Sequence, residues 1–241
     1  LGTWALIGIE RKEPVTDPAI VPIEWGNEGG TYGKTMLLKN LNGLWVIQQC
    51  RDFWNRENTA GHPLSWDDLT ALASESEDQN CSFDTNLEQF NRFQSNMPKV
   101  IAEYCRQTGQ DVPETIGEIA RCVYKSLALS AAASYEEILT ILKEDLELLH
   151  IVGGGTQNHL VCQWISNTMG LPCICGPIET TAAGNLLFQL KAAGHISSLE
   201  EGRQVCRASS ELYEIVPEET EHWKAQLKHF KKIKFTGRKV K

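Results

Sequence analysis

Three consecutive glycines, residues 153–155, are the strongest candidate in this chain for ligand chemistry. They follow an apolar run, residues 148–152, and precede a Thr-Gln-Asn segment at residues 156–158. An apolar run that ends in glycines is typical of a strand turning into a helix, where phosphates and nucleotides commonly bind. Glycine has no side chain and tolerates positive φ, so a planar base or a phosphate can approach the backbone directly. The pattern indicates a nucleotide site, and a plain tight turn with close helix–strand packing is the structural alternative.

Neither of the two common nucleotide-binding motifs is completed at this turn. The dinucleotide fingerprint G-x-G-x-x-G, started at Gly153, requires a glycine where Asn158 stands. The phosphate-binding loop requires Gly-Lys followed by Ser or Thr, and no such tripeptide lies near the turn. The residues of the turn by themselves therefore leave two interpretations open, a ligand site of another kind and a tight turn that only packs a helix against a strand.

The eight cysteines do not predict a metal or redox site. No C-x-x-C pair occurs, which excludes a zinc ribbon and a thioredoxin-type site. Cys173 and Cys175 alternate along an apparent strand and are interpreted as core residues that share one face. Cys105 and Cys122 lie on successive predicted helices, and their spacing leaves open whether they form a disulfide. Reduced thiols are the default expectation, and no residue is assigned as a metal ligand.

The charge distribution argues against a nucleic-acid binder. The 241 residues carry a net charge of −8, but residues 224–241 hold seven Lys, one Arg and no acid. Residues 1–223 therefore contain 15 basic and 31 acidic residues, a net charge of −16 that repels phosphate backbones. The basic tail, residues 224–241, is interpreted as a solvated, frayed end, with a phosphate- or partner-binding role as the alternative. Apolar runs are too short to span a bilayer and no signal segment is visible, so we expect a cytoplasmic protein without membrane contact.

The periodicity of the chain predicts an α/β fold. Strands are expected at residues 3–9, 148–152 and 172–175, and an extended segment at residues 19–23 would pair back to form a β-meander, before a turn at residues 27–30. Helices are expected at residues 37–54, 97–107, 113–142, 156–169, 180–193, 198–209 and 217–230. Residues 62–82 are expected to form a short helix plus a loop, with Ser65 as the N-cap of the helix. A strand under way at residue 1 suggests that the chain is a domain of a longer protein. Strands alternating with helices in the second half indicate a layered sheet flanked by helices.

A series of short motifs occurs in order over residues 2–210. These motifs are Gly2-Thr3-Trp4, Asn27-Glu28-Gly29-Gly30, Leu38-Lys39-Asn40, Gly43-Leu44-Trp45 with Gln48, Arg121-Cys122, Ser126-Leu127-Ala128, His150 to Asn158, Gly176-Pro177-Ile178-Glu179 and Gly184-Asn185. The ordered series resembles the C-terminal half of the FGGY carbohydrate kinases, and within that family is most similar to the L-rhamnulokinases.

The resemblance implies an RNase H-like, actin-like ATPase lobe, with ATP bound between this lobe and an N-terminal one. Thr3 matches a turn that approaches the β- and γ-phosphates, and Gln48 matches another nucleotide-side position. Gly153, Gly154 and Gly155 match the adenosine motif. Asn40 matches a position that faces the cleft, where a fixed amide would orient the sugar substrate or a phosphate. Without the resemblance, Thr3 would be interpreted as a strand residue, Asn40 and Gln48 as helix-surface amides, and His150 as a hydrogen-bonded core histidine.

The implied reaction is transfer of the ATP γ-phosphoryl group to a ketose hydroxyl, with Mg²⁺ bridging the phosphates. L-Rhamnulose is the favoured sugar, and L-fuculose or a pentulose is the alternative. A non-catalytic actin-like module that binds a nucleotide or a partner is the alternative of a different class. The family's base is an Asp in the N-terminal lobe, so no catalytic residue is assigned within residues 1–241. The chain also has Ala5 and Leu1 at positions where the family commonly carries hydroxyl residues near the phosphate turn.

Overall fold

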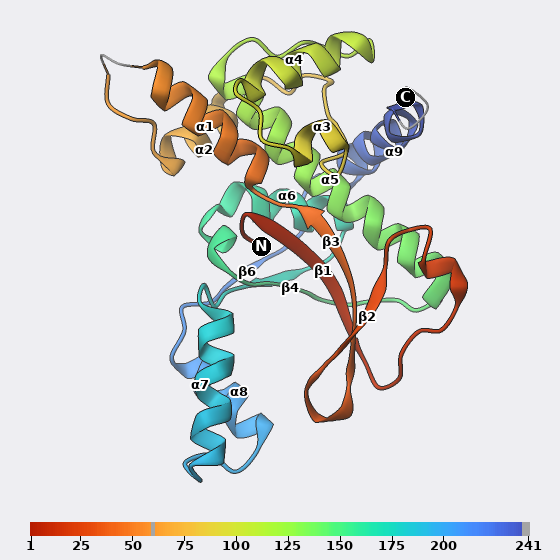
Figure 1. Ribbon diagram of the computed structural model, residues 1–241, viewed down its shortest axis with the longest axis vertical. Coiled ribbons are helices and arrows are strands. Elements are labelled where there is room, and N and C mark those ends of the chain that lie inside the picture. Colours follow the sequence, from red (N-terminus) through yellow and green to blue (C-terminus); the bar gives the residue numbers. More distant parts are fainter. Residues whose placement is uncertain (59–60, 238–241) are drawn as a thin grey trace.

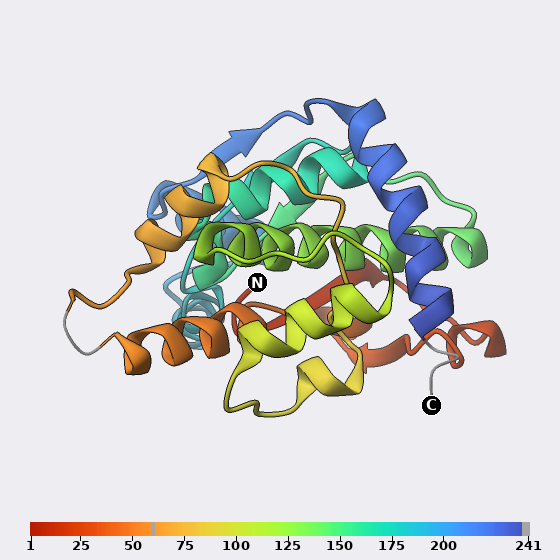
Figure 2. The same ribbon diagram turned by 90° about the horizontal axis from the view of Figure 1, so that it is seen from above.

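A computed structural model describes residues 1–58 and 61–237, which fold into two small sheets packed against a layer of helices (Figures 1 and 2). The first sheet has the antiparallel order β1-β3-β2, formed by Trp4–Arg11, Thr35–Asn42 and Gly26–Gly29. The second has the order β4-β5-β6, formed by Leu149–Ile151, Cys173–Cys175 and Tyr213–Ile215. β4 and β5 are parallel, whereas β6 runs antiparallel to β5. The expected α/β class is confirmed, with two three-stranded sheets in place of a single mixed one.

The two sheets meet where β1 begins and β4 ends. The nitrogen of Leu1 donates to the carbonyl of Val152 at 2.5 Å, and the Gly155 N–H donates to the carbonyl of Leu1 at 2.8 Å. These bonds place the residues before β1 against the glycine turn, although about 150 residues of sequence separate them. The start of the chain and the glycine turn therefore form one structural unit.

Helix α5 (Ile116–Leu142) crosses the centre of the molecule and contributes residues to all three buried hydrophobic clusters (Figure 2). It begins with a capping box, in which the Thr115 side chain accepts from the Glu118 N–H and the Glu118 side chain accepts from the Thr115 N–H. These backbone N–H groups at the start of the helix therefore have hydrogen-bond partners. α5 packs against α2 and α6, and also contacts α1, α4, α9 and both long strands. The other helices are α1 (Trp45–Glu57), α2 (Trp66–Glu75), α3 (Glu88–Asn91), α4 (Met97–Gln107), α6 (His159–Met169), α7 (Thr180–Ala192), α8 (Leu199–Ala208) and α9 (Thr220–Gly237).

Most predicted elements of the second half are confirmed within a few residues. The structure also confirms the Ser65 cap of α2, which forms a capping box with Asp68, and the expected helix α4, which follows an Asn96 cap that the sequence analysis did not assign. Strand β6 has no counterpart in the sequence prediction, because its three residues are too few to show a period. No helix in the described part of the chain is both long and apolar enough to cross a membrane.

The prediction for residues 19–42 is wrong in three places. Residues 19–23 form a 3₁₀ turn and bends instead of an extended segment, and residues 26–29 form β2 instead of a turn. The helix expected from residue 37 begins only at Trp45, because residues 35–42 form the central strand β3. The leucines of this stretch also fit helical spacing, but β3 pairs with β1 along its whole length and with β2 over residues 35–38, and this pairing satisfies its backbone groups.

The basic tail is not a frayed end over its described part. Residues 220–237 form α9, which packs on α5 and α6. Its buried residues recur at helical spacing: Trp223, Leu227, Phe230 and Ile233. The lysines between them face outward, as expected for an amphipathic helix. The basic composition of this segment therefore reflects the solvent-facing side of the helix and gives no sign of its buried side. Residues 238–241 lie outside the described residues.

The predicted environment of His150 is also wrong. Strand β4 alternates, so that Ile151 turns into the core and His150 is exposed to solvent. Cys173 and Cys175 are both buried with sulfur atoms 3.6 Å apart, which confirms that they share a core face. Cys105 and Cys122 are free, buried thiols and form no disulfide.

Candidate functional site

A hollow of about 530 Å³ lies where β1 begins, beside the glycine turn and the first turns of α1 and α2. Four of the six predicted ligand residues line it: Thr3, Gln48, Gly154 and Gly155. They come from three separate parts of the chain, which the tertiary structure brings to one cavity. Its other lining residues are Gly2, Leu44, Ile47, Ser65, Trp66, Asp67, Thr70, Tyr124, Gln157 and Asn158.

The backbone of the Gly2-Thr3 turn is held by the start of α1. The Leu44 N–H donates to the Gly2 carbonyl at 2.8 Å, and the N–H groups of Gly43 and Trp45 both donate to the Thr3 carbonyl at 3.2 Å. A Cβ at position 43 would lie 2.4 Å from the Gly2 carbonyl oxygen, so only glycine allows this close approach. The turn that the resemblance places near the terminal phosphates is therefore rigidly positioned.

The side chains of Thr3 and Gln48 are directly connected. The Gln48 Nε2 donates to the Thr3 Oγ1 at 3.0 Å. A hydroxyl has one proton to donate and two lone pairs to accept with. Because Gln48 occupies one lone pair, the Thr3 proton is left to donate into the hollow.

The three glycines of the turn have different roles. Gly153 takes φ of 93°, a conformation that L residues with side chains rarely adopt, and does not line the hollow. A Cβ on Gly155 would lie 2.8 Å from the Leu1 carbonyl oxygen, so this glycine is required for packing. A Cβ on Gly154 would meet no atom within 4 Å. Gly154 is thus the exposed glycine of the cavity wall, and its missing side chain leaves space that nothing in the described chain fills.

Side chains from four elements hold the glycine turn in place. Asn158 caps α6 by accepting from the Val161 N–H at 3.0 Å, and its amide donates to the Thr70 hydroxyl of α2 at 3.1 Å. Tyr213 of β6 donates its hydroxyl to the Thr156 carbonyl. Tyr124 of α5 reaches the floor of the hollow, where burial raises the pKa of its hydroxyl against the opposing effect of hydrogen bonds with Thr70 and Asn158.

The structure adds lining residues that sequence reasoning did not assign. These are chiefly Trp66, Asp67 and Thr70 on the first turns of α2, and Tyr124 on α5. The sequence contains the Ser65 cap that starts α2, but no pattern in it says that this turn faces residues 154–158. Their contribution is visible only in three dimensions.

Asn40 lies apart from this hollow. It is exposed on β3, opposite Leu6 of β1, and its carbonyl accepts from the Asn86 amide at 3.2 Å. Leu6 is also exposed. The structure therefore places Asn40 on an open face of the first sheet and not with the glycine turn.

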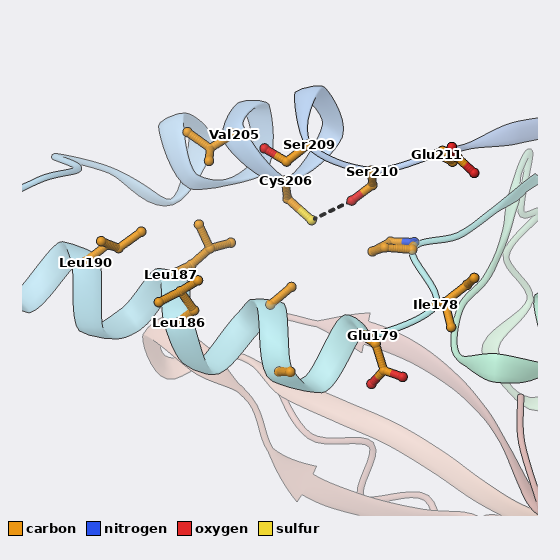
Figure 3. Close-up of a pocket in the computed structure, with 13 residues that line it drawn as sticks. Ile178, Glu179, Leu186, Leu187, Leu190, Val205, Cys206, Ser209, Ser210 and Glu211 are labelled. Carbon is orange, nitrogen blue, oxygen red and sulfur yellow. Dashed lines mark hydrogen bonds between the residues drawn. The ribbon is translucent and has the colours of Figure 1, made fainter.

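A second hollow, of about 520 Å³, lies between α7 and α8 (Figure 3). Leucines 186, 187 and 190 of α7 and Val205 of α8 form its walls, while Glu179 points away from it. It contains none of the predicted ligand residues and few polar groups that could orient a substrate. The hollow beside the glycine turn is therefore the better candidate for chemistry.

Residues 1–58 and 61–237 contain no group of three His, Cys, Asp or Glu side chains placed to hold a metal ion. The described residues therefore do not fit a Mg²⁺ site built from protein ligands alone.

Comparisons with known proteins agree with this architecture. Residues 1–193 match the C-terminal domain of the FGGY family of carbohydrate kinases. The chain is 34% identical to the rhamnulokinase of Bacteroides thetaiotaomicron over 230 residues, covering 95% of this chain and 46% of the relative. It is 36% identical to the rhamnulokinase of Bacillus subtilis over 218 residues, covering 90% of this chain and 44% of the relative. The chain thus spans about half the length of these relatives.

Solved structures of low sequence identity share the fold. A gluconate kinase from Lactobacillus acidophilus superposes with a TM-score of 0.71 at 13% identity, covering 99% of this chain and 46% of that one. A Plasmodium falciparum glycerol kinase solved with ADP superposes with a TM-score of 0.68 at 12% identity, covering 100% of this chain and 46% of that one. At such identities the likeness concerns the fold alone.

Proposed function

The chain belongs to the FGGY family of carbohydrate kinases, and we propose that residues 1–241 form the nucleotide-binding, C-terminal lobe of an ATP-dependent sugar kinase. The observation that carries this proposal is the convergence of Thr3, Gln48, Gly154 and Gly155 on one hollow. A volume of about 530 Å³ is in the range of small-molecule sites. The similarity of the fold to a glycerol kinase solved with ADP supports the same ligand class.

In this proposal the terminal phosphates of ATP lie beside Thr3. The backbone of the Gly2-Thr3 turn is held by α1, and the Gln48 amide orients the Thr3 hydroxyl so that its proton is free for a phosphoryl oxygen. A preorganised donor of this kind stabilises charge that develops in the transition state without first having to reorganise. The open side of Gly154 allows the nucleoside to lie directly against the backbone of the turn.

The chain's own residues bind and orient the nucleotide in this mechanism, and they do not abstract a proton. The base belongs to the N-terminal lobe, as in the family that the sequence resembles, and closure of the two lobes aligns the sugar hydroxyl with the γ-phosphoryl group and excludes water. Mg²⁺, when bound with ATP, supplies neutralisation of phosphate charge. We assign it no ligand in the described part of the chain.

L-Rhamnulose is the proposed sugar, on the basis of the rhamnulokinases at 34–36% identity. Asn40 is proposed to contact the sugar from the open face of β3, where it would be directed toward the other lobe. Another ketose, such as L-fuculose or a pentulose, is the alternative substrate.

The test is a coupled ADP-release assay on the protein that contains this chain together with the N-terminal lobe. L-Rhamnulose, L-fuculose and pentuloses would be compared at equal concentration with ATP and Mg²⁺. Turnover with L-rhamnulose at the highest kcat/KM supports the proposal. A preference for another ketose would change the assigned substrate and leave the assignment as a sugar kinase intact. ADP binding without turnover on any sugar would favour a non-catalytic nucleotide-binding module.

A further inference from the structure

Trp66 is a large aromatic side chain in the wall of the candidate site that the proposed phosphate contacts leave unexplained. It occupies the first position of α2, directly after the Ser65 cap, and lines the hollow together with Thr3 and Gly154. The side chain is 44% exposed. An indole that served only to pack the core would be covered, so the exposed part of Trp66 remains available to a ligand.

The indole of Trp66 is covered by a cation outside the hollow. The guanidinium carbon of Arg51 on α1 lies 4.4 Å from the centre of the indole ring. Arg51 is itself fixed, because its Nε donates to the Leu64 carbonyl at 2.7 Å. Arg51 is not among the residues that line the hollow, although Trp66 is. Arg51 therefore holds the indole from outside the hollow that the indole itself lines.

The same hollow offers space beside the ring for a second planar group. The glycine turn forms part of the wall, and a Cβ at Gly154 would meet no atom within 4 Å, so the wall is open at this position. Thr3, the donor proposed for the phosphates, lies at the start of β1, and Gln48, which orients it, lies on α1, whereas Trp66 lies on α2. The cavity thus has a polar part suited to phosphates and an aromatic part suited to a base.

We propose that Trp66 is a stacking platform for the nucleobase of the bound nucleotide, with Arg51 as the positioning residue that holds the indole. The inference rests on the proposed function and adds to it a specificity-determining residue. A purine is the expected base, because its two fused rings cover more of the indole face than a single pyrimidine ring does. Stacking of bases on aromatic side chains is an established source of affinity in other proteins.

The experiment is calorimetric titration of the 241-residue chain with ADP, UDP and inorganic pyrophosphate, each in the presence of Mg²⁺. Trp66→Ala is expected to weaken ADP binding about 10-fold, because the base loses its platform. Trp66→Phe, which retains an aromatic face, is expected to stay within about threefold of the unaltered chain. Pyrophosphate has no base, so its affinity should be equal in all three proteins, and the preference for ADP over UDP should disappear in Trp66→Ala.

Phe93→Ala is the matched control, because Phe93 is an aromatic residue that is 73% exposed and lies outside the hollow. Unchanged ADP affinity in Trp66→Ala, with ADP binding still abolished by Gly154→Val, would overturn the stacking role and leave the proposed function intact. An equal loss of ADP and pyrophosphate in Trp66→Ala would overturn it as well, because it would reveal a structural role for the indole. If the unaltered chain bound pyrophosphate and no ADP, the proposed function and the stacking role would both fail.

Discussion

The amide of Gln48 donates a 3.0 Å hydrogen bond to the hydroxyl of Thr3, which joins helix α1 to the start of strand β1. The two residues are 45 positions apart in the sequence. This bond fixes the direction of a hydroxyl that would otherwise rotate freely. It converts a threonine that could be a simple strand residue into a positioned donor.

The first prediction concerns that donor. In the protein that contains both lobes, Thr3→Val is expected to lower kcat about 10²-fold, with a smaller rise in the KM for ATP, because the transferring group gains charge in the transition state. Thr3→Ser should retain most of the activity, since it keeps the hydroxyl. Steady-state kinetics with varied ATP provide the measurement, and an unchanged kcat in Thr3→Val would return Thr3 to the role of a strand residue.

The second prediction separates the two neighbouring glycines of the turn. Gly154→Val should abolish ADP binding, which we expect on the order of 0.1–10 mM for the 241-residue chain, because methyl groups would occupy the nucleotide space. The free energy of unfolding of the Gly154→Val variant should remain unchanged, since nothing lies within 4 Å of the new Cβ. Gly155→Val should instead lower the free energy of unfolding by roughly 1–3 kcal/mol through overlap with the Leu1 backbone.

Calorimetry and urea unfolding of both variants check this contrast. Equal ADP binding by Gly154→Val and the unaltered chain would contradict the assignment of the glycine turn as the nucleotide site. Equal destabilisation by the two substitutions would show that position 154 is packed and not open.

The third prediction is that the 241-residue chain alone phosphorylates no sugar. Loss of a positioned general base costs roughly 10²–10⁴-fold in rate, and loss of substrate positioning adds to it. ADP release with ATP, Mg²⁺ and L-rhamnulose would be compared between this chain and the protein that also contains the N-terminal lobe. Turnover by the 241-residue chain within about a hundredfold of the larger protein, the low end of the base effect, would place the base among residues 1–241.

The fourth prediction concerns acid stability. Burial raises the pKa of Asp78, but the hydrogen bond and charge of Lys125, together with the charges of Arg121 and His222, outweigh burial and lower it overall. The Lys125 Nζ lies 2.8 Å from the Asp78 carboxylate. A carboxyl with a lowered pKa in the folded state stabilises the protein above its unfolded pKa of about 3.9, and this contribution disappears as pH falls through the lower folded value.

Asp78→Asn should therefore lower the free energy of unfolding at pH 7 by about 1–2 kcal/mol, a reduced value because the carboxyl is partly exposed. The difference from the unaltered chain should shrink as pH falls below about 4. Urea unfolding at several pH values tests both parts. Glu88→Gln is the control, because the Glu88–Arg92 pair is largely exposed and should change stability little. A difference that stays constant down to pH 2 would contradict the assigned role of the carboxyl.

Local features of the fold could be predicted from the sequence because their causes are local. The Ser65 cap bonds a backbone group three residues away, so α2 begins directly after the cap that the sequence predicts. The turn at residues 153–155 and the alternation of Cys173 and Cys175 likewise depend on neighbouring residues alone. The family resemblance rested on the same kind of short, ordered motifs.

Only the tertiary structure decided which local features meet. The leucines within residues 37–42 fit helical spacing, yet these residues belong to strand β3, which pairs with β1 and with β2. Long-range strand pairing overrides the weak local preference for a helix. Trp66 and Gly154 line one cavity although 88 positions separate them, and no periodic pattern encodes that contact. His150 and the lysines of α9 lead to the same conclusion. Composition and local pattern suggest which residues could be buried or exposed, but the burial of a side chain depends on the elements that pack against it.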